Sequence, residues 1–412
     1  MIPDRAGPGS RGTLTPAADQ TAATQRFQLS EATSHNCGIE SNQLMKRILL
    51  IAVPGIGDAF LATPLIGALK RAYPRASIDV LVRDGKTILD GNPDVSNVLV
   101  QPRRPPIRHS ARFLARVFRT YDLAVSTSTT DRAFIILFAA ASIRVGKVAS
   151  MKRETWWKRR LVRDYVLMDP DAHVLSENLR IADVLGVERH YPPTLPHRPQ
   201  QATSEALSLP FETGGRSFVV IHMKPGSIAR QWPENHWHVL IEQLRERGVA
   251  VVATGGGSPG ERAYVDGIVS RASAAASGVP ACSLAGKLQF HEYVELVRHA
   301  ALFIGTDTSA THVAAATGIP TVALFGPTDP VRWGPWPIGL EHDGSPWKRD
   351  GIRQTAGNVT LLRASCGCNS RQQPCGQAPG MPGACMSGLS PETVLATVDG
   401  ILEQVRAARR LG

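Results

Sequence analysis

The sequence predicts an α/β protein made of two doubly wound, Rossmann-like domains that face a central cleft. Short apolar runs alternate with amphipathic helical stretches along most of the chain, a pattern typical of parallel sheets covered by helices on both faces. The alternation stops at one proline-rich segment and then begins again, so it forms two series. A length of 412 residues is also more than one hydrophobic core usually fills.

The chain is expected to begin with a disordered extension at residues 1–44. This segment is rich in Gly, Pro, Ser, Thr and Ala, and it lacks the apolar core of a signal peptide. Met45 stands directly before the first strong strand, so a mis-assigned start upstream of a true Met45 is a second interpretation.

The first predicted domain covers residues 45–190. Its strands are expected at residues 47–53 and 78–82, with shorter elements near Val98 and Leu123. A helix should run from Asp58 to about Tyr73 and stop before Pro74, because proline cannot continue it.

The longest apolar run of the chain extends from Ala133 to Ile143, between Arg132 and Arg144. It has about half of the roughly 20 residues that a membrane-spanning helix needs. We therefore expect a buried helix at this position.

A linker is predicted at residues 191–216, which contain five prolines and no periodicity. The second domain covers residues 217–340, and residues 341–412 should form a Cys-rich segment and a C-terminal helix that starts at Pro391. Strands of the second domain are expected at residues 218–222, 249–253, 302–305 and 321–324, and helices at residues 234–247, 261–271, 291–300 and 308–316.

The positive charge of the chain is concentrated in one segment. The formal net charge is +11, and residues 45–200 alone hold 25 Lys and Arg against 14 Asp and Glu, also a net +11. Residues 201–412 hold 18 against 17. This distribution argues against a uniformly basic nucleic-acid-binding protein, and it favours a protein with one half that faces an anion.

The first strand is followed by a turn that places a carboxylate at the expected cleft. Gly55 and Gly57 permit a tight turn and the close approach of a ligand. Asp58 then lies at the helix N-terminus, where it could cap the helix or act on a substrate. The third glycine of the dinucleotide-binding fingerprint is missing.

A helix start in the second domain suits a phosphate. Asp307, Thr308 and Ser309 surround the point where a strand passes into a helix, and free backbone N–H groups and the helix dipole favour an anion there. His312 follows about one turn later and could point the same way. Ordinary N-capping and a buried core histidine are the alternative interpretations.

Two further loops at strand ends could contribute to the same site. Lys224 and Arg230 offer cations for a phosphate, although solvated surface charge is the commoner role of such residues. The glycine-rich turn at Gly255 and Gly256 precedes Glu261, whose carboxylate could accept hydrogen bonds from a ribose, although a plain loop is also compatible. The loop at residues 324–334 is typical of a structural turn.

These motifs, together and in this order, resemble glycosyltransferase family 9, the heptosyltransferase family of lipopolysaccharide core assembly. The resemblance covers about residues 46–340. Its carriers are Gly55-Ile-Gly-Asp-Ala59, Ala62-Thr-Pro64, Gly91-Asn-Pro93, Pro225-Gly-Ser227, Trp232-Pro233, Gly255-Gly256, Asp307-Thr308 with His312, and Gly326-Pro-Thr-Asp-Pro330.

The resemblance implies a GT-B fold and inverting, metal-independent transfer of a sugar from a nucleotide diphosphate, typically ADP-heptose, with no other cofactor. The acceptor would bind the first domain and the nucleotide the second. By position, Asp58 resembles the general base that deprotonates the acceptor. The predicted donor-binding residues are Lys224, Ser227, Arg230, Gly255, Gly256, Glu261, Asp307, Thr308, Ser309 and His312.

The chain departs from the family pattern at two of these positions. Ser309 stands where the family usually has glycine, and Arg230 stands where it commonly has lysine. The serine could narrow the phosphate pocket, and arginine keeps the charge but changes the geometry. Either change could reflect a different donor sugar.

The basic segment contains two clusters that suit an anionic membrane surface or a phosphorylated lipid acceptor, and a solvated basic face is the alternative. Arg108, Arg112, Arg159 and Arg160 are the candidate acceptor or membrane residues. The first cluster is Arg103, Arg104, Arg108, Arg112, Arg116 and Arg119, of which the last four should share a helix face. The second is Lys152, Arg153, Lys158, Arg159, Arg160 and Arg163, with Trp156 and Trp157 between.

Two patterns could bind a metal. Four cysteines, Cys366, Cys368, Cys375 and Cys385, could hold a structural zinc ion, but they lack the usual Cys-x2-Cys pairs, so reduced thiols or a labile disulfide are alternatives. The Asp169-Pro-Asp171 segment lies outside the strand-end motifs, and we interpret it as a loop.

The sequence therefore predicts an inverting glycosyltransferase that acts on a cell-envelope glycolipid in the cytoplasm, on the inner face of the cytoplasmic membrane. A transferase with another nucleotide sugar and acceptor, or a non-catalytic subunit that binds a sugar nucleotide, is the alternative. The presence of Asp58 argues against the subunit, since binding alone needs no base.

Overall fold

The computed structural model describes residues 45–53, 55–83, 86–198, 217–274, 278–364 and 383–411, without the side chains of residues 86 and 409–411. The predicted extension at residues 1–44, most of the predicted linker and three of the four clustered cysteines, Cys366, Cys368 and Cys375, lie outside these residues. Within the described segments, no helix has both the length and the apolar character to cross a membrane.

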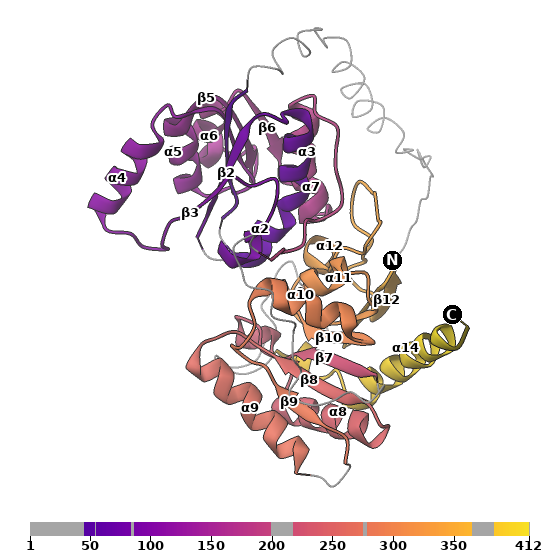
Figure 1. Ribbon diagram of the computed structural model, residues 1–412. Coiled ribbons are helices and arrows are strands. Elements are labelled where there is room, and N and C mark those ends of the chain that lie inside the picture. The colour runs from indigo at the N-terminus through magenta and orange to yellow at the C-terminus, as the bar shows by residue number, and fades with distance from the viewer. Residues whose placement is uncertain are drawn as a thin grey trace, which may run out of the picture. The chain divides into compact units, whose positions relative to one another are not determined.

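The first sheet consists of six parallel strands in the order β3-β2-β1-β4-β5-β6 (Figure 1). Its strands are β1 (Arg47–Ile51), β2 (Ser77–Val82), β3 (Asn97–Val100), β4 (Tyr121–Ser126), β5 (Ala141–Val148) and β6 (Asp164–Leu167). Its helices are α2 (Ile56–Leu61), α3 (Thr63–Ala72), η3 (Lys86–Leu89), α4 (Ile107–Val117), α5 (Asp131–Ala140), η4 (Arg153–Thr155), α6 (Trp156–Leu161) and α7 (Val174–Val184).

Helices cover both faces of this sheet because successive strand residues point to opposite sides. Ile48 and Leu50 of β1 pack in one core cluster with α3 and α7. Leu49 and Ile51 pack in another cluster with α4 and α5. These strand residues are all fully buried, which is why β1 is an unbroken apolar run.

The second sheet has seven strands in the order β12-β13-β11-β10-β7-β8-β9, parallel except for β12. Its strands are β7 (Phe218–His222), β8 (Ala250–Thr254), β9 (Ala281–Ser283), β10 (Leu302–Thr306), β11 (Thr321–Phe325), β12 (Arg353–Ala356) and β13 (Val359–Arg363). Its helices are η5 (Ile228–Arg230), α8 (Glu234–Glu246), α9 (Pro259–Ser273), α10 (Phe290–His299), α11 (Ser309–Ala316), α12 (Pro330–Trp333), α13 (Ala384–Ser387) and α14 (Pro391–Leu411).

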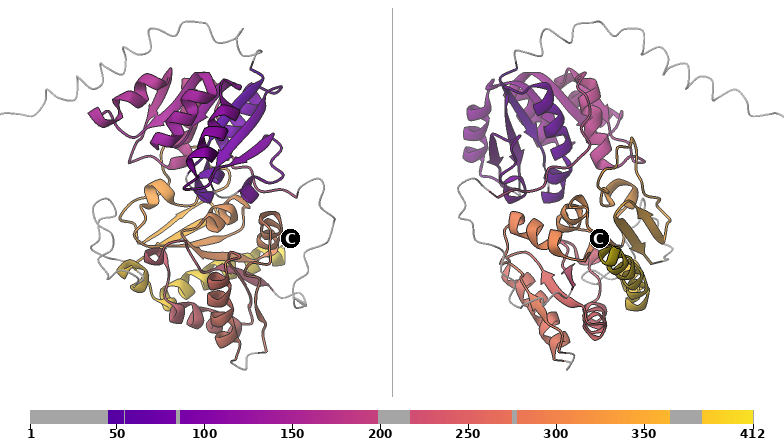
Figure 2. Two further views of the ribbon diagram at one scale, coloured as in Figure 1. Left: turned by 90° about the vertical axis from the view of Figure 1, so that its left-hand side faces the viewer. Right: turned by 45° about the vertical axis from the view of Figure 1, so that its right-hand side comes forward.

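This sheet is also doubly wound. Val219 and Ile221 of β7 pack in a cluster with α8, α9 and α14, whereas Val220 packs in a cluster with α10 and α11. The views in Figure 2 show helices on both sides of each sheet. Two predominantly parallel, doubly wound sheets confirm the predicted fold class, GT-B.

The strand order reverses at β1/β4 in the first sheet and at β7/β10 in the second. In open sheets of this kind, ligands bind at such switch points, beyond the carboxyl ends of the strands. Asp58 follows β1, Lys224 follows β7 and Asp307 follows β10. The topology thus places three sequence motifs at the two switch points.

Two helix predictions were wrong in detail. The helix expected from Asp58 to Tyr73 is interrupted at Ala62, and α3 begins at Thr63 with Pro64 in its first turn, where backbone N–H groups have no helical partner, so the N–H that proline lacks is not missed. The helix expected across residues 133–143 ends at Ala140, and the rest of the apolar run forms the start of β5. Short apolar runs of this kind do not distinguish a helix from a buried strand.

Candidate functional site

A cavity of about 760 Å³ lies at the switch points and is lined from both halves of the described chain. Gly55, Ile56, Gly57 and Asp58 line it from the first half. From the second half it is lined by His222, Lys224, Pro225, Gly226, Arg230, Thr254, Gly255, Gly256, Glu261, Leu284, Leu288, Gln289, Phe290, Tyr293, Asp307, Thr308, Ser309, Ala310, His312, Thr328 and Trp333.

The cavity brings together nearly all the residues that the sequence predicts for the donor and the base. Of the predicted donor residues, Ser227 is the exception: it precedes η5 and does not line the cavity. The candidate membrane residues Arg108, Arg112, Arg159 and Arg160 lie elsewhere, on α4 and α6.

Asp58 both caps α2 and lines the cavity, so its two sequence interpretations are compatible. Its Oδ2 accepts a hydrogen bond from the backbone N–H of Gly55 at 3.0 Å. Burial raises the pKa of the Asp58 carboxyl, while the charge of Lys147 and the N–H of Gly55 oppose this rise. A carboxylate with a raised pKa is better suited to accept a proton than a fully solvated one.

On the second half, Arg230 is fixed by a buried carboxylate. Its Nη1 lies 3.0 Å from Asp307 Oδ2 and also donates to the Asp307 carbonyl oxygen at 3.1 Å. Asp307 itself is buried, and the Arg230 side chain is about one-third exposed. This pairing orients the guanidinium within the cavity wall and leaves its other nitrogens for a ligand.

The N-terminus of α11 opens into the same cavity. Thr308 is the N-cap, and its hydroxyl oxygen accepts from the backbone N–H of Thr311 at 3.4 Å. Burial lowers the pKa of His312, so its ring is neutral, and Nδ1 of this ring has no hydrogen-bond partner in the described residues. An unpartnered ring nitrogen and the remaining N–H groups suit a polar, anionic ligand.

The glycine-rich turn after β8 is closed by Glu261. Its Oε1 accepts from the backbone N–H of Gly256 at 2.6 Å. A Cβ atom at Gly256 would lie 2.6 Å from Glu261 Oε2, so a larger residue at this position would displace the Glu261 carboxylate. Glu261 therefore shapes the turn as well as lining the cavity.

Sequence reasoning missed several residues of the cavity. His222 is the last residue of β7, and its Nδ1 lies 3.0 Å from the hydroxyl of Thr254, which also donates to the Ile221 carbonyl. Since this hydroxyl has one proton, Nδ1 of His222 carries the hydrogen and donates it. Burial lowers the pKa of His222 to about 4. Its place at a strand end beside Lys224 was a usable signal.

The apolar residues of the cavity gave no such signal. Leu284, Leu288 and Phe290 line one part of it, in and near a loop that follows the short strand β9. Leucine and phenylalanine occur throughout any hydrophobic core, so their composition alone does not mark a binding surface.

Several predictions about the basic segment were wrong. Arg119 lies outside α4, with a positive φ of 52° and a hydrogen bond to Ser142, so it does not share the helix face. Lys158 is buried and paired with Asp131 at 2.6 Å, which removes it from the exposed basic cluster. Trp157 packs edge-on against Phe134, whereas Trp156 is 53% exposed.

The two candidate metal patterns differ in what the structure shows. Asp169 and Asp171 lie in the loop between β6 and α7 and pair with Arg180 and Arg349. Cys385 is buried on α13, and the other three cysteines lie outside the described residues. In the described segments, no group of three or more His, Cys, Asp or Glu side chains could hold a metal ion.

The family model described as glycosyltransferase family 9 (heptosyltransferase) matches residues 112–342. Lipopolysaccharide heptosyltransferase 3 of Escherichia coli is 31% identical over 298 residues, which are 68% of this chain and 83% of that protein.

Among solved structures, E. coli ADP-heptose lps heptosyltransferase II has a TM-score of 0.63 at 21% identity and covers 87% of this chain and 99% of its own. The E. coli heptosyltransferase WaaC with ADP has a TM-score of 0.61 at 18% identity and covers 86% and 99%.

Proposed function

Because the chain belongs to glycosyltransferase family 9, the heptosyltransferase family, we propose that it moves a heptose from ADP-heptose to the lipopolysaccharide core. The observation that carries this proposal is the shared cavity, where Asp58 from the first half faces the cations and the helix N-terminus of the second. The family makes the chain a glycosyltransferase, so the non-catalytic alternative is abandoned. The donor, the acceptor and the residue roles are the proposed part.

The two halves take different substrates in this proposal. Residues 217–340 bind the nucleotide sugar, with Lys224, Arg230 and the start of α11 around the diphosphate. The neutral His312 ring and the Glu261 carboxylate offer further polar groups for the donor. Leu284, Leu288 and Phe290 supply an apolar surface of the kind that a nucleotide base contacts.

The acceptor binds to residues 45–190. A second cavity, of about 210 Å³, lies at the ends of β1 and β2, and three of its lining residues are Arg83, Arg103 and Arg132. Three arginines around a small cavity favour an acceptor that carries phosphate or carboxylate groups. These arginines support acceptor binding to the first half by an observation that does not depend on the donor cavity.

The reaction is a single displacement. Asp58 accepts the proton of the acceptor hydroxyl while that oxygen forms a bond to the anomeric carbon of the donor. The bond between this carbon and the β-phosphate oxygen breaks, and its electron pair stays on ADP. Attack from the side opposite the leaving group inverts the anomeric configuration. A carboxylate base and fixed positive charge at the departing diphosphate are the groups that this step needs.

We propose that this charge comes from the chain and not from a metal ion. Lys224, Arg230 and the N-terminus of α11 lie on one wall of the cavity, where the leaving diphosphate would gain negative charge. These groups are held in place before the reaction, so they need no rearrangement as the charge develops.

A basic surface on the first half supports a further proposal: the enzyme works at the cytoplasmic face of the membrane. The surface consists of exposed cations with exposed apolar side chains on and beside α4, α5 and α6, which contact one another in sequence order. Its residues are Arg108, Arg112, Arg116, Arg153 and Arg160, with Ile107, Phe118, Ile135, Phe138 and Trp156. Cytoplasmic leaflets are negatively charged, so this combination fits them.

The proposal is tested with purified protein, ADP-heptose and a heptose-deficient lipopolysaccharide core. We expect release of ADP together with a mass gain of one heptose on the acceptor, undiminished when EDTA is present. UDP- and GDP-sugars at equal concentration serve as the donor control. Transfer from one of these and not from ADP-heptose would identify the other nucleotide-sugar chemistry instead, and loss of activity in EDTA that added metal restores would contradict metal independence.

A further inference from the structure

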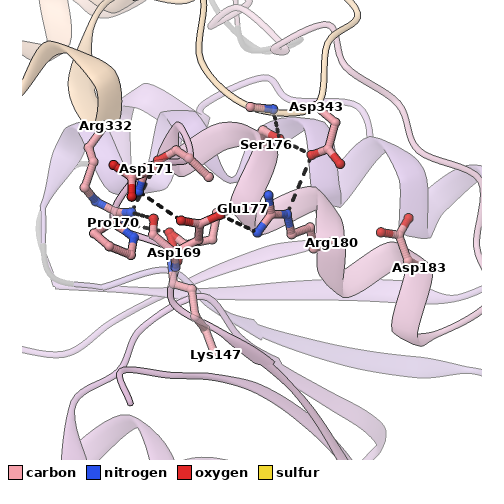
Figure 3. A network of polar contacts seen from close by, with 12 residues as sticks. Lys147, Asp169, Pro170, Asp171, Ser176, Glu177, Arg180, Asp183, Arg332 and Asp343 are labelled. Atoms are coloured by element: carbon pink, nitrogen blue, oxygen red, sulfur yellow. Dashed lines mark hydrogen bonds and ion pairs between the residues drawn. The ribbon is translucent and has the colours of Figure 1, made fainter. Parts of the chain in front are cut away.

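A row of buried charges joins the two halves of the protein (Figure 3). Arg332 on α12 comes from the second half, and its Nη2 lies 2.6 Å from Glu177 Oε2 on α7 of the first half. Glu177 is fully buried and the Arg332 side chain is 14% exposed. The other carboxylate oxygen of Glu177 accepts from the backbone N–H of Asp169 at 3.3 Å. The Glu177 carboxylate is therefore fully engaged.

Lys147 lies on the other side of Glu177. Its Nζ on β5 is 3.7 Å from Glu177 Oε2, and its side chain is only 6% exposed. The same nitrogen donates to Asn178 Oδ1 at 3.0 Å. The Asn178 amide in turn donates to the carbonyl oxygen of Leu61 at 3.3 Å, on the helix that carries Asp58. Polar contacts thus continue from Arg332 to the helix of the proposed base.

Charges of opposite sign alternate along this row. In their charged forms, Asp58 and Glu177 are negative, and Lys147 and Arg332 are positive. The charge of Lys147 is the strongest of the influences that keep the pKa of Asp58 from rising further with burial. Burial lowers the pKa of Lys147, and the nearby charge of Glu177 is the strongest influence against this lowering, whereas the charge of Arg332 adds to it. Three of the four groups belong to the first half, and the fourth arrives only through contact with the second half.

We propose that Arg332, Glu177 and Lys147 are positioning residues that keep Asp58 ready to accept a proton only while the two halves are in contact. The proposal rests on the role of Asp58 as base. Arg332 also belongs to the segment whose Thr328 and Trp333 line the donor cavity. Arg332 thereby links three features: the contact between the halves, the donor side of the cavity and the proposed base.

The expected effect follows from counting charges. Without Arg332, Asp58 and Glu177 are two carboxylates that share the single cation of Lys147. Glu177 then has lost its partner at 2.6 Å and can draw the Lys147 ammonium, now 3.7 Å away, closer to itself, so Asp58 loses part of its compensation. Asp58 keeps its proton to higher pH, so the acid limb of the kcat profile moves upward in pH.

Other charged groups face this row and stay constant in the comparison. Arg83 also acts on Asp58 from the end of β2. The titratable and charged groups of the shared cavity wall are His222, Lys224, Arg230, Glu261, Asp307 and His312. None of these is changed in the variants below. Arg332 also acts on His173 at the start of α7, so a limb that moves in both Arg332→Met and Lys147→Met reports on the row itself.

The experiment compares kcat–pH profiles for transfer from ADP-heptose. Arg332→Met and Lys147→Met should each move the acid limb upward by about one pH unit, which lowers kcat on that limb about tenfold, with the donor KM little changed. Lys147→Met leaves the Arg332–Glu177 pair intact, so it gives the test even if an unpaired buried Glu177 prevents folding. Arg332→Lys restores a cation and should return the limb towards the wild-type position.

The double variant Glu177→Gln/Arg332→Met separates charge from packing. It removes one charge of each sign, so the limb should return close to its wild-type position, whereas lost packing would make the double variant worse than Arg332→Met. Arg349→Met is the matched control, because Arg349 also joins the halves, through Asp171 and Asp329, without touching Glu177. A limb that moves equally in Arg349→Met, or that does not recover in the double variant, would overturn the proposal.

A direct titration separates this proposal from the proposed function. The Asp58 carboxyl is followed by carbon-13 NMR in labelled protein without substrate, with Asp58→Asn to assign the signal. If the wild type transfers no heptose, the reaction assignment fails, yet a higher Asp58 pKa in Arg332→Met still supports the row of charges. An Asp58 pKa that is the same in wild type and Arg332→Met overturns the row even when transfer is normal.

Discussion

The charged groups of the shared cavity and those of the basic surface are held in opposite ways. In the cavity, Arg230 is paired with the buried Asp307 at 3.0 Å. On the basic surface, Arg108, Arg112 and Arg160 are exposed and make no ion pair with any described residue. The surface lies in the segment with a net charge of +11, whereas residues 201–412 are nearly neutral.

This difference indicates two kinds of electrostatic work. A buried ion pair is costly to desolvate and has a fixed geometry, so it can meet one ligand group at one place. Exposed arginines without partners create a diffuse field that salt screens within about 10 Å. We therefore expect the buried charges to control chemistry and stability, and the exposed charges to control only association.

The largest effect should come from the buried carboxylate at the reaction centre. Asp58→Asn keeps the size of the side chain and can still accept from the N–H of Gly55, but it cannot take a proton. General-base catalysis contributes roughly 10²–10⁴-fold to a rate, so kcat should fall by that factor. Donor binding, measured by calorimetry with ADP, should be unchanged. Near-normal kcat in Asp58→Asn would remove the base assignment.

Acid pH should destabilise the folded protein through the buried side chain of His173. This residue N-caps α7 through Nδ1, and its Nε2 donates to the Gly334 carbonyl oxygen of the second half at 2.8 Å. Burial lowers its pKa to about 3. An unfolded histidine titrates near 6.5, so between these values the unfolded chain binds a proton that the folded chain does not. His173 therefore leaves the free energy of unfolding unchanged above pH of about 6.5. Below that pH it lowers the free energy of unfolding, by roughly 3 kcal/mol at pH 4.

The check on this is urea unfolding at pH values from neutral to 4. His173→Asn keeps a short polar cap at the start of α7 and should make the pH dependence of the unfolding free energy less steep, with the part that is due to His222 remaining. His299→Asn is the control, because His299 is exposed at the end of α10. Parallel pH slopes for wild type and His173→Asn would show that this histidine is not the group that takes up the proton.

Arg230 should have an intermediate effect, on donor binding. Arg230→Met removes a cation from the cavity wall and leaves Asp307 buried without its partner. Removing the cation that meets a ligand phosphate in a binding site costs about 2 kcal/mol or more of binding free energy, so the Kd for ADP should rise at least about 30-fold. Arg247→Met is the matched control, since Arg247 pairs with Asp399 away from the cavity. Equal ADP affinities in the two variants would contradict a phosphate role.

Sequence reasoning predicted the order of motifs better than the environment of each side chain. The strand predicted at residues 218–222 is confirmed by β7, and glycines and helix starts located Asp58, Asp307 and Glu261 at the cavity. These are local signals, because a turn or an N-cap requires particular residues at particular positions.

Contacts between distant segments could not be predicted in this way. Lys147 and Glu177 belong to none of the motifs found in the sequence, and only the packing of α7 against β5 makes them a buried pair. Similarly, the sequence predicts Lys158 as part of a surface cluster, but in the structure it pairs with Asp131 from another helix. Charge in a sequence is additive, but burial and pairing depend on the tertiary fold.

The smallest effect per residue should be found on the basic surface. Each arginine near an anionic membrane contributes about 1 kcal/mol, so Arg108→Glu/Arg112→Glu should weaken binding to vesicles that contain anionic lipid, and added salt should weaken wild-type binding in the same direction. The matched control is Arg298→Glu/Arg353→Glu, which makes the same charge change at exposed positions of the second half. Co-sedimentation measures the binding, and transfer to a short soluble core acceptor should be unaffected by either pair. Equal loss of vesicle binding in both pairs would mean that net charge, and not this surface, governs association, whereas lost transfer to the soluble acceptor would show that the exposed arginines belong to the reaction after all.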